Sequence, residues 1–325
     1  MATFPGVTDE PTRPQTYRRR RLVALAALVA AVVLVAGGLI ALGGGDDTGP
    51  RAAEGGGDRP AQPPPPELPR GGRSIFPEFR VVAYYGAPQS DELGALGIGS
   101  PASAARKLER QAEPYVRERR PVLPALELIA VIANADAGED GQYRSRQTNA
   151  VIGRYLRAAR RAKALLLLDI QPGRSDFFTE TTRLRRWLRE PDVGLALDPE
   201  WRVQPGEVPG QVIGRVGSRE VNATTAWLDQ LAARNRLPEK LVIIHQFTDN
   251  MVDDTALKPR ANLRVVLNVD GFGGQAVKRS KYRAFTRQAP DFEPGFKLFY
   301  KEDLDLMSPR QVLRLRPPPD FVVYE

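Results

Sequence analysis

Eight short apolar runs recur along residues 74–325, and longer segments separate them. The runs occupy residues 80–86, 125–133, 163–171, 193–200, 240–247, 263–272, 296–302 and 320–325. Runs of this length bounded by turn residues are typical of buried strands. Most of the intervening segments carry helical patterns; the first begins at Ser100 and Pro101, which are well placed as N-cap and first helical residue. Strands alternating with helices predict right-handed crossovers and a parallel sheet.

Eight strand-helix units in residues 74–325 match the size of a closed barrel. The helical pattern after the fifth run is weak, the one after the sixth is short, and no outer helix follows the eighth. An open doubly wound sheet is the alternative, and it would bind nucleotide through a glycine-rich first turn. That turn contains Gly94, Gly97 and Gly99, whose spacing reverses the G-x-G-x-x-G order. The predicted fold is therefore α/β, a (β/α)8 TIM-type barrel.

The N-terminal segment has the pattern of a membrane anchor. Residues 1–21 are polar and end in four arginines, and residues 22–42 contain no charged side chain. About 20 apolar residues cross a bilayer as a helix, and flanking arginines favour the cytoplasmic side. We therefore expect a cytoplasmic tail, a transmembrane helix over 22–42 and an extracellular C-terminal domain. A cleaved signal peptide is the alternative, although its apolar core is usually about 7–15 residues long.

Residues 43–73 are rich in glycine and proline, including the run PPPP, and predict a disordered linker between the membrane and a barrel domain at 74–325. The chain contains no cysteine, so the exported domain would be stable without disulfides.

The formal charge of +8 does not by itself indicate a nucleic-acid partner. Outside the run of four arginines, the basic residues are scattered among acids instead of forming one strip with aromatic side chains. We expect no nucleic acid to bind, whereas a weakly basic surface is compatible with an anionic cell-wall polymer.

Polar side chains collect at the predicted C-terminal ends of the strands, where barrel enzymes build their sites. In the run VGLALDPE, alternation places Gly194, Ala196, Asp198 and Glu200 on one face and the larger apolar residues on the other. The small residues and both acids should therefore point into the barrel. The other strand ends supply Tyr84, Tyr85, Asp169, Gln171, His245, Gln246, Asn268, Asp270 and Tyr300. Each acid taken alone is equally compatible with a turn signal, because Asp before Pro or Gly commonly starts a turn.

The single histidine, His245, limits the chemistry. Zinc hydrolases and phosphodiesterases with paired histidines need more imidazole groups, and the chain has neither a cysteine nucleophile nor a G-x-S-x-G motif. A magnesium or calcium site of oxygen ligands from Asp169, Asp198, Glu200 and Asp270 is left open. We expect no resident cofactor.

Glu127 lies inside its strand and is expected to pair with an arginine.

Carboxyl groups with aromatic and amide neighbours favour sugar chemistry. One carboxylic acid protonates the glycosidic oxygen, a second carboxylate handles the developing positive charge, and aromatic rings stack on the sugar. Asp198 and Glu200 are two residues apart, so one of them is expected to hold its proton near neutral pH.

The runs VVAYYG and GLALDPEW resemble the first and fourth strands of family 18, chitinase-type glycosidases, and family 25 lysozymes also carry a D-x-E on the fourth strand. The resemblance implies that Glu200 is the general acid and Asp198 its partner. Ala196 stands where the chitinase pattern has a further aspartate, and Tyr84 and Tyr85 stand where the lysozyme type has an early one. The runs LLLLDIQPGRSDFF, GLALDPEW and LVIIHQFTDNM are also similar to uncharacterised exported barrel proteins of high-GC Gram-positive bacteria.

These observations predict a membrane-tethered extracellular glycoside hydrolase for a cell-wall or exopolysaccharide glycan. The expected catalytic carboxyl groups are Glu200 and Asp198, with Asp169 or Asp270 as a second carboxylate. The expected substrate-binding residues are Tyr84, Tyr85, Gln171, Trp201, His245, Gln246, Asn268 and Tyr300. The alternative is a non-catalytic glycan-binding barrel, in which Asp198 and Glu200 pair with arginines such as Arg174 or Arg202.

Overall fold

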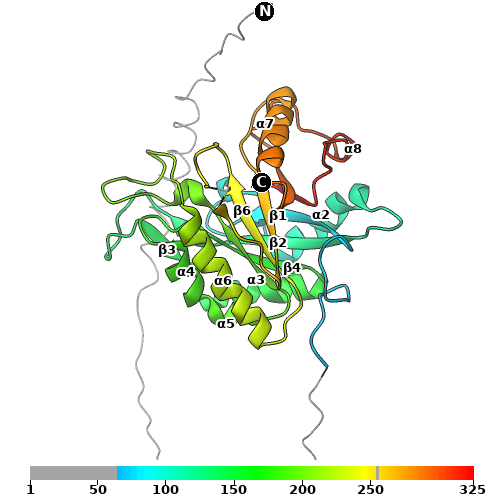
Figure 1. Ribbon diagram of the computed structural model, residues 1–325, viewed down its shortest axis with the longest axis horizontal. Coiled ribbons are helices and arrows are strands. Elements are labelled where there is room, and N and C mark those ends of the chain that lie inside the picture. Colours follow the sequence, from blue (N-terminus) through cyan, green and yellow to red (C-terminus); the bar gives the residue numbers. More distant parts are fainter. Residues whose placement is uncertain (1–63, 254–255) are drawn as a thin grey trace, which may run out of the picture.

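Eight parallel strands close into a barrel in the computed structural model, which describes residues 64–253 and 256–325 (Figure 1). The barrel strands are β1 (Arg80–Gly86), β2 (Val122–Ala133), β4 (Leu165–Ile170), β5 (Val193–Leu197), β6 (Lys240–Gln246), β7 (Leu263–Val269), β8 (Glu293–Leu298) and β9 (Phe321–Tyr324). Each strand pairs with the next in chain order, and β9 pairs with β1 to close the ring. The barrel prediction is confirmed, and the open-sheet alternative is wrong.

Helices cover the outside of the barrel. They are α2 (Pro101–Ala112), α3 (Asn149–Arg161), α4 (Phe177–Arg183), α5 (Arg185–Leu188), α6 (Ser218–Arg234), α7 (Gln275–Gln288) and α8 (Pro309–Val312). The start of α2 is capped as expected, because the Ser100 hydroxyl accepts the Ser103 N–H at 3.2 Å and Pro101 is the first helical residue. Apart from residues 254 and 255, which lie outside the description, the connection from β6 to β7 contains no α-helix. The sequence showed only a weak helical pattern after this strand, and that observation is confirmed.

A ninth strand, β3 (Arg144–Arg146), was not expected from the sequence. It pairs antiparallel with the end of β2 and lies outside the ring. Its two arginines both bind Glu180 on α4, at 2.9 Å from Arg144 Nε and 2.6 Å from Arg146 Nε. Three polar residues carry no apolar signal, so this pairing is visible only in three dimensions.

The alternation expected in β5 separates two hydrophobic cores. Ala196 packs inside the barrel with Leu241, Ile243 and Val266. Leu195, on the opposite face, joins the larger core between the sheet and the helices. The interior therefore receives the small residues of this strand, as predicted.

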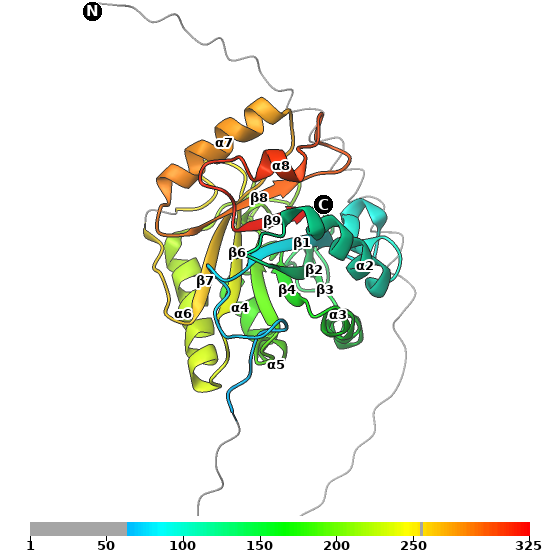
Figure 2. The same ribbon diagram turned by 90° about the vertical axis from the view of Figure 1, so that its right-hand side faces the viewer.

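The segment before β1 closes the N-terminal end of the barrel. Leu68 and Ile75 are buried among interior residues, Arg70 donates to the Val122 carbonyl at 2.8 Å, and Arg73 donates to the Leu237 carbonyl at 2.9 Å. This segment runs below the barrel, away from α7 and α8 (Figure 2). The packed domain thus includes residues ahead of position 74, where the linker was expected to end.

The transmembrane helix expected over residues 22–42 lies outside the described residues. Among residues 64–253 and 256–325, no helix is long and apolar enough to cross a membrane.

Gly194 tests how tightly the interior is packed. An added Cβ would lie 2.6 Å from the Leu241 carbonyl oxygen and 2.7 Å from a Leu167 methyl carbon. Gly194→Ala is therefore expected to lower the free energy of unfolding by about 1–3 kcal/mol in urea denaturation, because the backbone must shift. Gly274→Ala is the control, since nothing lies within 4 Å of its added Cβ. Equal losses in the two variants would contradict this account of the interior.

Candidate active site

Charged and polar side chains fill the C-terminal half of the barrel interior. We call this set the interior polar cluster; it comprises Tyr85, Glu127, Asp169, Gln171, Asp198, His245, Asn268, Asp270 and Lys297. None of these residues is more than 5% exposed. Buried charges are costly unless they are paired, so the pairing pattern decides which groups carry charge.

His245 joins two carboxylates across the barrel. Its Nε2 lies 2.9 Å from Glu127 Oε1, and its Nδ1 lies 3.0 Å from Asp270 Oδ2. Burial alone would lower the pKa of His245, but the hydrogen bonds to Asp270 and Glu127 raise it well above the usual value. With a carboxylate within hydrogen-bond distance of each ring nitrogen, the site favours the protonated imidazole. This corrects the expectation that Glu127 pairs with an arginine.

Lys297 supplies the second buried cation. Its Nζ lies 2.7 Å from Glu325 Oε2, 3.1 Å from Asp270 Oδ2 and 4.0 Å from the centre of the Tyr85 ring. Burial raises the pKa of Asp270, but Lys297 and His245 outweigh it and bring the pKa below its usual range. Gly271 N–H also donates to Asp270 Oδ1 at 2.6 Å. Asp270 is therefore an anion with both oxygens engaged, which argues against the catalytic role expected for it.

The pKa of Asp169 is shifted in the opposite direction from that of Asp270. Burial and the neighbouring charge of Asp198 raise its pKa well above the usual value, against a smaller lowering by His245. Tyr85 OH donates to Asp169 Oδ2 at 3.2 Å, and Gln171 Nε2 donates to Tyr85 OH at 2.9 Å. Asp169 Oδ1 is buried with no hydrogen-bond partner among the described residues. Asp169 therefore holds its proton to a higher pH than an ordinary aspartate does.

The DPEW segment departs from the predicted extended strand. β5 ends at Leu197, and Pro199–Trp201 form a 3-10 turn. Proline fixes its own φ and lacks an N–H, so the strand pairing stops there. Asp198 still acts on the interior, since its charge raises the pKa of Asp169 and Tyr85. The expectation that Glu200 continues the same strand face is wrong; Glu200 is 7% exposed on the turn, and its carbonyl accepts the Gly214 N–H at 2.7 Å.

Four of the expected binding residues, Tyr84, Trp201, Gln246 and Tyr300, lie away from the interior polar cluster. Tyr84 belongs to the core beneath the helices, and Tyr300 OH lies 3.3 Å from its hydroxyl. Tyr300 is 40% exposed and stacks on Tyr324 at 5.3 Å between ring centres. Gln246 follows the inward-facing His245, so alternation turns it outward, and it is 1% exposed. Trp201 is half-buried on the turn. Tyr85, Asp169, Gln171, Asp198, His245, Asn268 and Asp270 are brought together as expected.

Sequence reasoning missed Lys297 and Glu325 and set Glu127 aside. Glu127 and Lys297 carry a signal in the sequence, because a charged residue at an inward position of an apolar strand must find a buried partner. Glu127 and Lys297 both stand at such positions, within ALELIAVIA and FKLFYKE.

Glu127, Asp169 and His245 also have the side-chain types of a metal site, and one ligand atom from each lies within 4.8 Å of the others. A metal would need the lone pair of His245 Nε2. That nitrogen lies 2.9 Å from Glu127 Oε1, so the two side chains can also pair directly with each other. A magnesium or calcium site made of carboxylate oxygens is less favoured at Asp270, because its oxygens already contact His245, Lys297 and Gly271.

A comparison with models of known protein families finds no match to this chain, and a comparison with curated proteins finds none either. The resemblance of GLALDPEW to glycosidase strands therefore stays a hypothesis based on the residues themselves.

The raised pKa of Asp169 can be tested through the pH dependence of the free energy of unfolding. In the unfolded chain this carboxyl ionises above about pH 4. The folded protein keeps the proton, so Asp169 lowers the stability of the parent as pH rises towards its folded pKa. Asp169→Asn removes this dependence. Relative to the parent, its free energy of unfolding in urea is expected to rise from pH 4 to pH 8.

Asp291→Asn is the control for this comparison, because Asp291 is exposed. Its stability should follow that of the parent at every pH. A difference between Asp169→Asn and the parent that is constant or falls with pH would mean that Asp169 is ionised in the folded protein.

Proposed function

We propose that this barrel is a glycoside hydrolase that acts on a cell-wall or exopolysaccharide glycan by carboxyl acid/base catalysis. The observation that carries the proposal is Asp169, a carboxyl group whose pKa is raised by burial and by Asp198 on the neighbouring strand. Acid/base cleavage of a glycosidic bond needs two nearby carboxyl groups, one of them with a raised pKa, and the C-terminal end of a barrel is where such sites are built.

In the proposed reaction, Asp169 gives its proton to the glycosidic oxygen as the bond to the anomeric carbon breaks. Asp198 faces the positive charge that develops on that carbon. Water then adds its oxygen to the carbon, and its released proton returns to Asp169. Asp169 is fully buried, so the proposed reaction needs the side chains at the strand ends, Asp198 and Gln171 among them, to make room for the sugar.

In this proposal Asp169 is the proton donor. The D-x-E resemblance suggested Glu200 for that role. Tyr85 orients the acid, because its hydroxyl donates to Asp169 Oδ2 while accepting from Gln171. Trp201 is half-buried beside Glu200 and offers an aromatic face to a sugar ring at the rim.

A non-catalytic glycan-binding barrel is the rival proposal, and the paired charges of His245, Asp270 and Lys297 are what favour it. That alternative expected Arg174 or Arg202 to hold the acids of DPEW. Arg202 Nε contacts Glu220 Oε1 at 3.2 Å, and Arg174 Nε donates to the Glu207 carbonyl at 2.9 Å, so each arginine also has a partner outside the DPEW turn. The raised pKa of Asp169 gives the hydrolase the stronger support.

Release of reducing ends from purified cell wall and from soluble glycans tests the proposal with the full chain. Asp169→Asn and Asp198→Asn are each expected to lower the rate at least about a hundredfold, as for loss of a general acid or its partner. Glu200→Gln should have a smaller effect, and Asp291→Asn should retain the parental rate. Full activity in Asp169→Asn would refute its role as the acid, and glycan binding without release by the parent would favour the rival.

We further propose that residues 22–42 tether the barrel to the membrane with the domain outside the cell. Deleting these residues is expected to move the protein from the membrane fraction to the soluble fraction, because about 20 apolar residues suffice to anchor a helix. Deleting residues 43–63 should leave the protein in the membrane fraction. A parent that is itself soluble after cell lysis would argue against the tether.

A further inference from the structure

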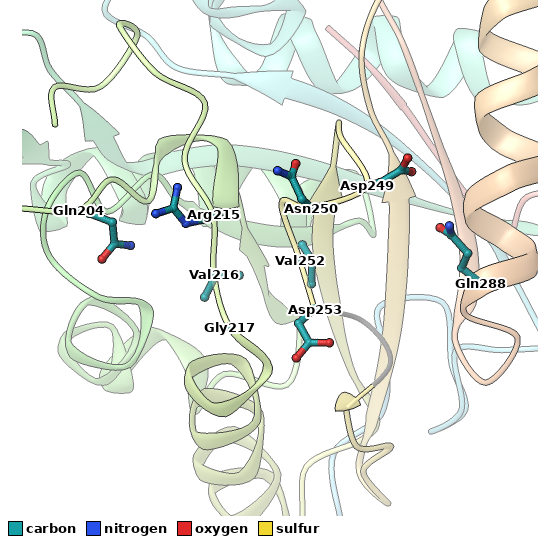
Figure 3. Close-up of a pocket in the computed structure, with 9 residues that line it drawn as sticks. All are labelled: Gln204, Arg215, Val216, Gly217, Asp249, Asn250, Val252, Asp253 and Gln288. Carbon is teal, nitrogen blue, oxygen red and sulfur yellow. The ribbon is translucent and has the colours of Figure 1, made fainter.

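A groove of about 720 Å³ lies between the start of α6 and the end of α7, beside the C-terminal end of β6 (Figure 3). Its polar lining residues are Gln204, Arg215, Asp249, Asn250, Asp253 and Gln288. The groove occurs beside the connection where a barrel helix would follow β6. Pockets of this volume are large enough for a small-molecule ligand.

The base of the groove is a fixed backbone element. Val216 and Val252 form a parallel bridge, and the Val216 N–H donates to the Met251 carbonyl at 2.9 Å. Both valines are buried, at 5% and 2% exposure. Ser218 Oγ lies 3.1 Å from Asp253 Oδ2, which joins the first residue of α6 to the opposite loop. The two loops are therefore held together before any ligand binds.

Several polar groups around the groove are not used by the protein. Within the part of the chain that the structure describes, the side chains of Gln204, Arg215 and Gln288 make no hydrogen bond or ion pair. Asn250 accepts from Thr248 Oγ1 at 3.0 Å through its oxygen, which leaves its amide N–H groups to donate. These groups come from three separate segments and provide both donors and acceptors around one space (Figure 3).

The charges of the lining select the ligand class. Among the described residues of the lining, Arg215 is the one cationic residue, whereas Asp249 and Asp253 are both acidic. An anionic ligand would meet two carboxylates for one guanidinium, whereas a neutral ligand can use amide, guanidinium and carboxylate groups together through hydroxyls. Neutral hydroxyl-rich sugars fit this lining better than uronic acids or phosphates.

The groove wall is also tied to the DPEW turn. Gly214 N–H donates to the Glu200 carbonyl at 2.7 Å, and Arg215 N–H donates to the Arg202 carbonyl at 2.9 Å. An added Cβ on Gly214 would lie 2.6 Å from the Glu200 oxygen, so the two segments are in direct contact. A ligand that binds Arg215 therefore lies next to the rim of the candidate active site.

We propose that this groove is a binding subsite for a neutral sugar unit of the glycan chain that the barrel acts on. The inference rests on the proposed function, because it assigns the groove to the same substrate. Arg215 and Asn250 donate to sugar hydroxyls, and Asp249 accepts from them. The subsite holds the chain at a distance from the reacting bond, so it contributes to affinity and not to the chemical step.

The test measures binding by calorimetry in the full chain carrying Asp169→Asn, which prevents turnover. The probes are the tetramers of β-1,4-linked N-acetylglucosamine and glucose, with a galacturonate tetramer as the anionic comparison. Arg215→Ala, added to Asp169→Asn, is expected to weaken binding of a neutral tetramer at least about tenfold, since a hydrogen bond involving a charged group contributes about this factor. Asn250→Ala, added to Asp169→Asn, is expected to weaken it about two- to tenfold, as for a hydrogen bond between neutral groups. Arg219→Ala is the matched control, because Arg219 is exposed on the first turn of α6 and outside the lining.

Each result decides a separate question. If the parent releases reducing ends but both groove variants bind like Arg219→Ala, the subsite is wrong while the hydrolase proposal stands. If groove variants lose binding and the parent releases nothing, the subsite stands without the hydrolase. Preference for the galacturonate tetramer overturns the neutral class, and a protein that binds none of the three tetramers overturns the subsite.

Discussion

Charge pairing inside the barrel decides what the rest of its C-terminal end can do. His245 and Lys297 are buried, and each lies within hydrogen-bond distance of two carboxylates, with Asp270 shared between them. Removing one partner of such a pair typically costs about 3–5 kcal/mol, because the other charge stays buried without compensation. Both cations pair with other acids, and the pKa of Asp169 is raised by burial and by the neighbouring charge of Asp198.

Much of the fold could be predicted from local patterns, because each strand is an uninterrupted apolar run with its own turn residues. The inward position of Ala196 and Asp198 also followed from simple alternation. Glu200 did not, since the proline at 199 replaces extended backbone by a 3-10 turn. Tyr84 and Gln246 were misplaced for a related reason: two adjacent strand residues point to opposite faces, so only Tyr85 and His245 of each pair can reach the interior. Which acid holds a proton depends on distances between strands, and no single segment encodes them.

The two loops after β5 and β6 carry most of the features that distinguish this barrel from a plain scaffold. One follows the DPEW turn and returns to it through Gly214, and the other replaces a regular helix on the outside of the sheet. Loop side chains lie at the surface and do not have to fit into a packed core. Loops held by a rigid barrel can therefore carry the polar groups that bind a ligand. The site and the groove accordingly share backbone hydrogen bonds while they use different side chains.

The segment of residues 64–79 crosses the N-terminal end of the barrel, where Leu68, Ile75 and Phe76 join the interior core and Arg73 binds the loop before β6. The interior polar cluster is at the other end. Any attachment made through the N-terminal side therefore reaches the domain at the pole opposite its mouth. If the proposed tether exists, it enters the domain at the end opposite the interior polar cluster and leaves the cluster's end of the barrel unobstructed by the described N-terminal segment.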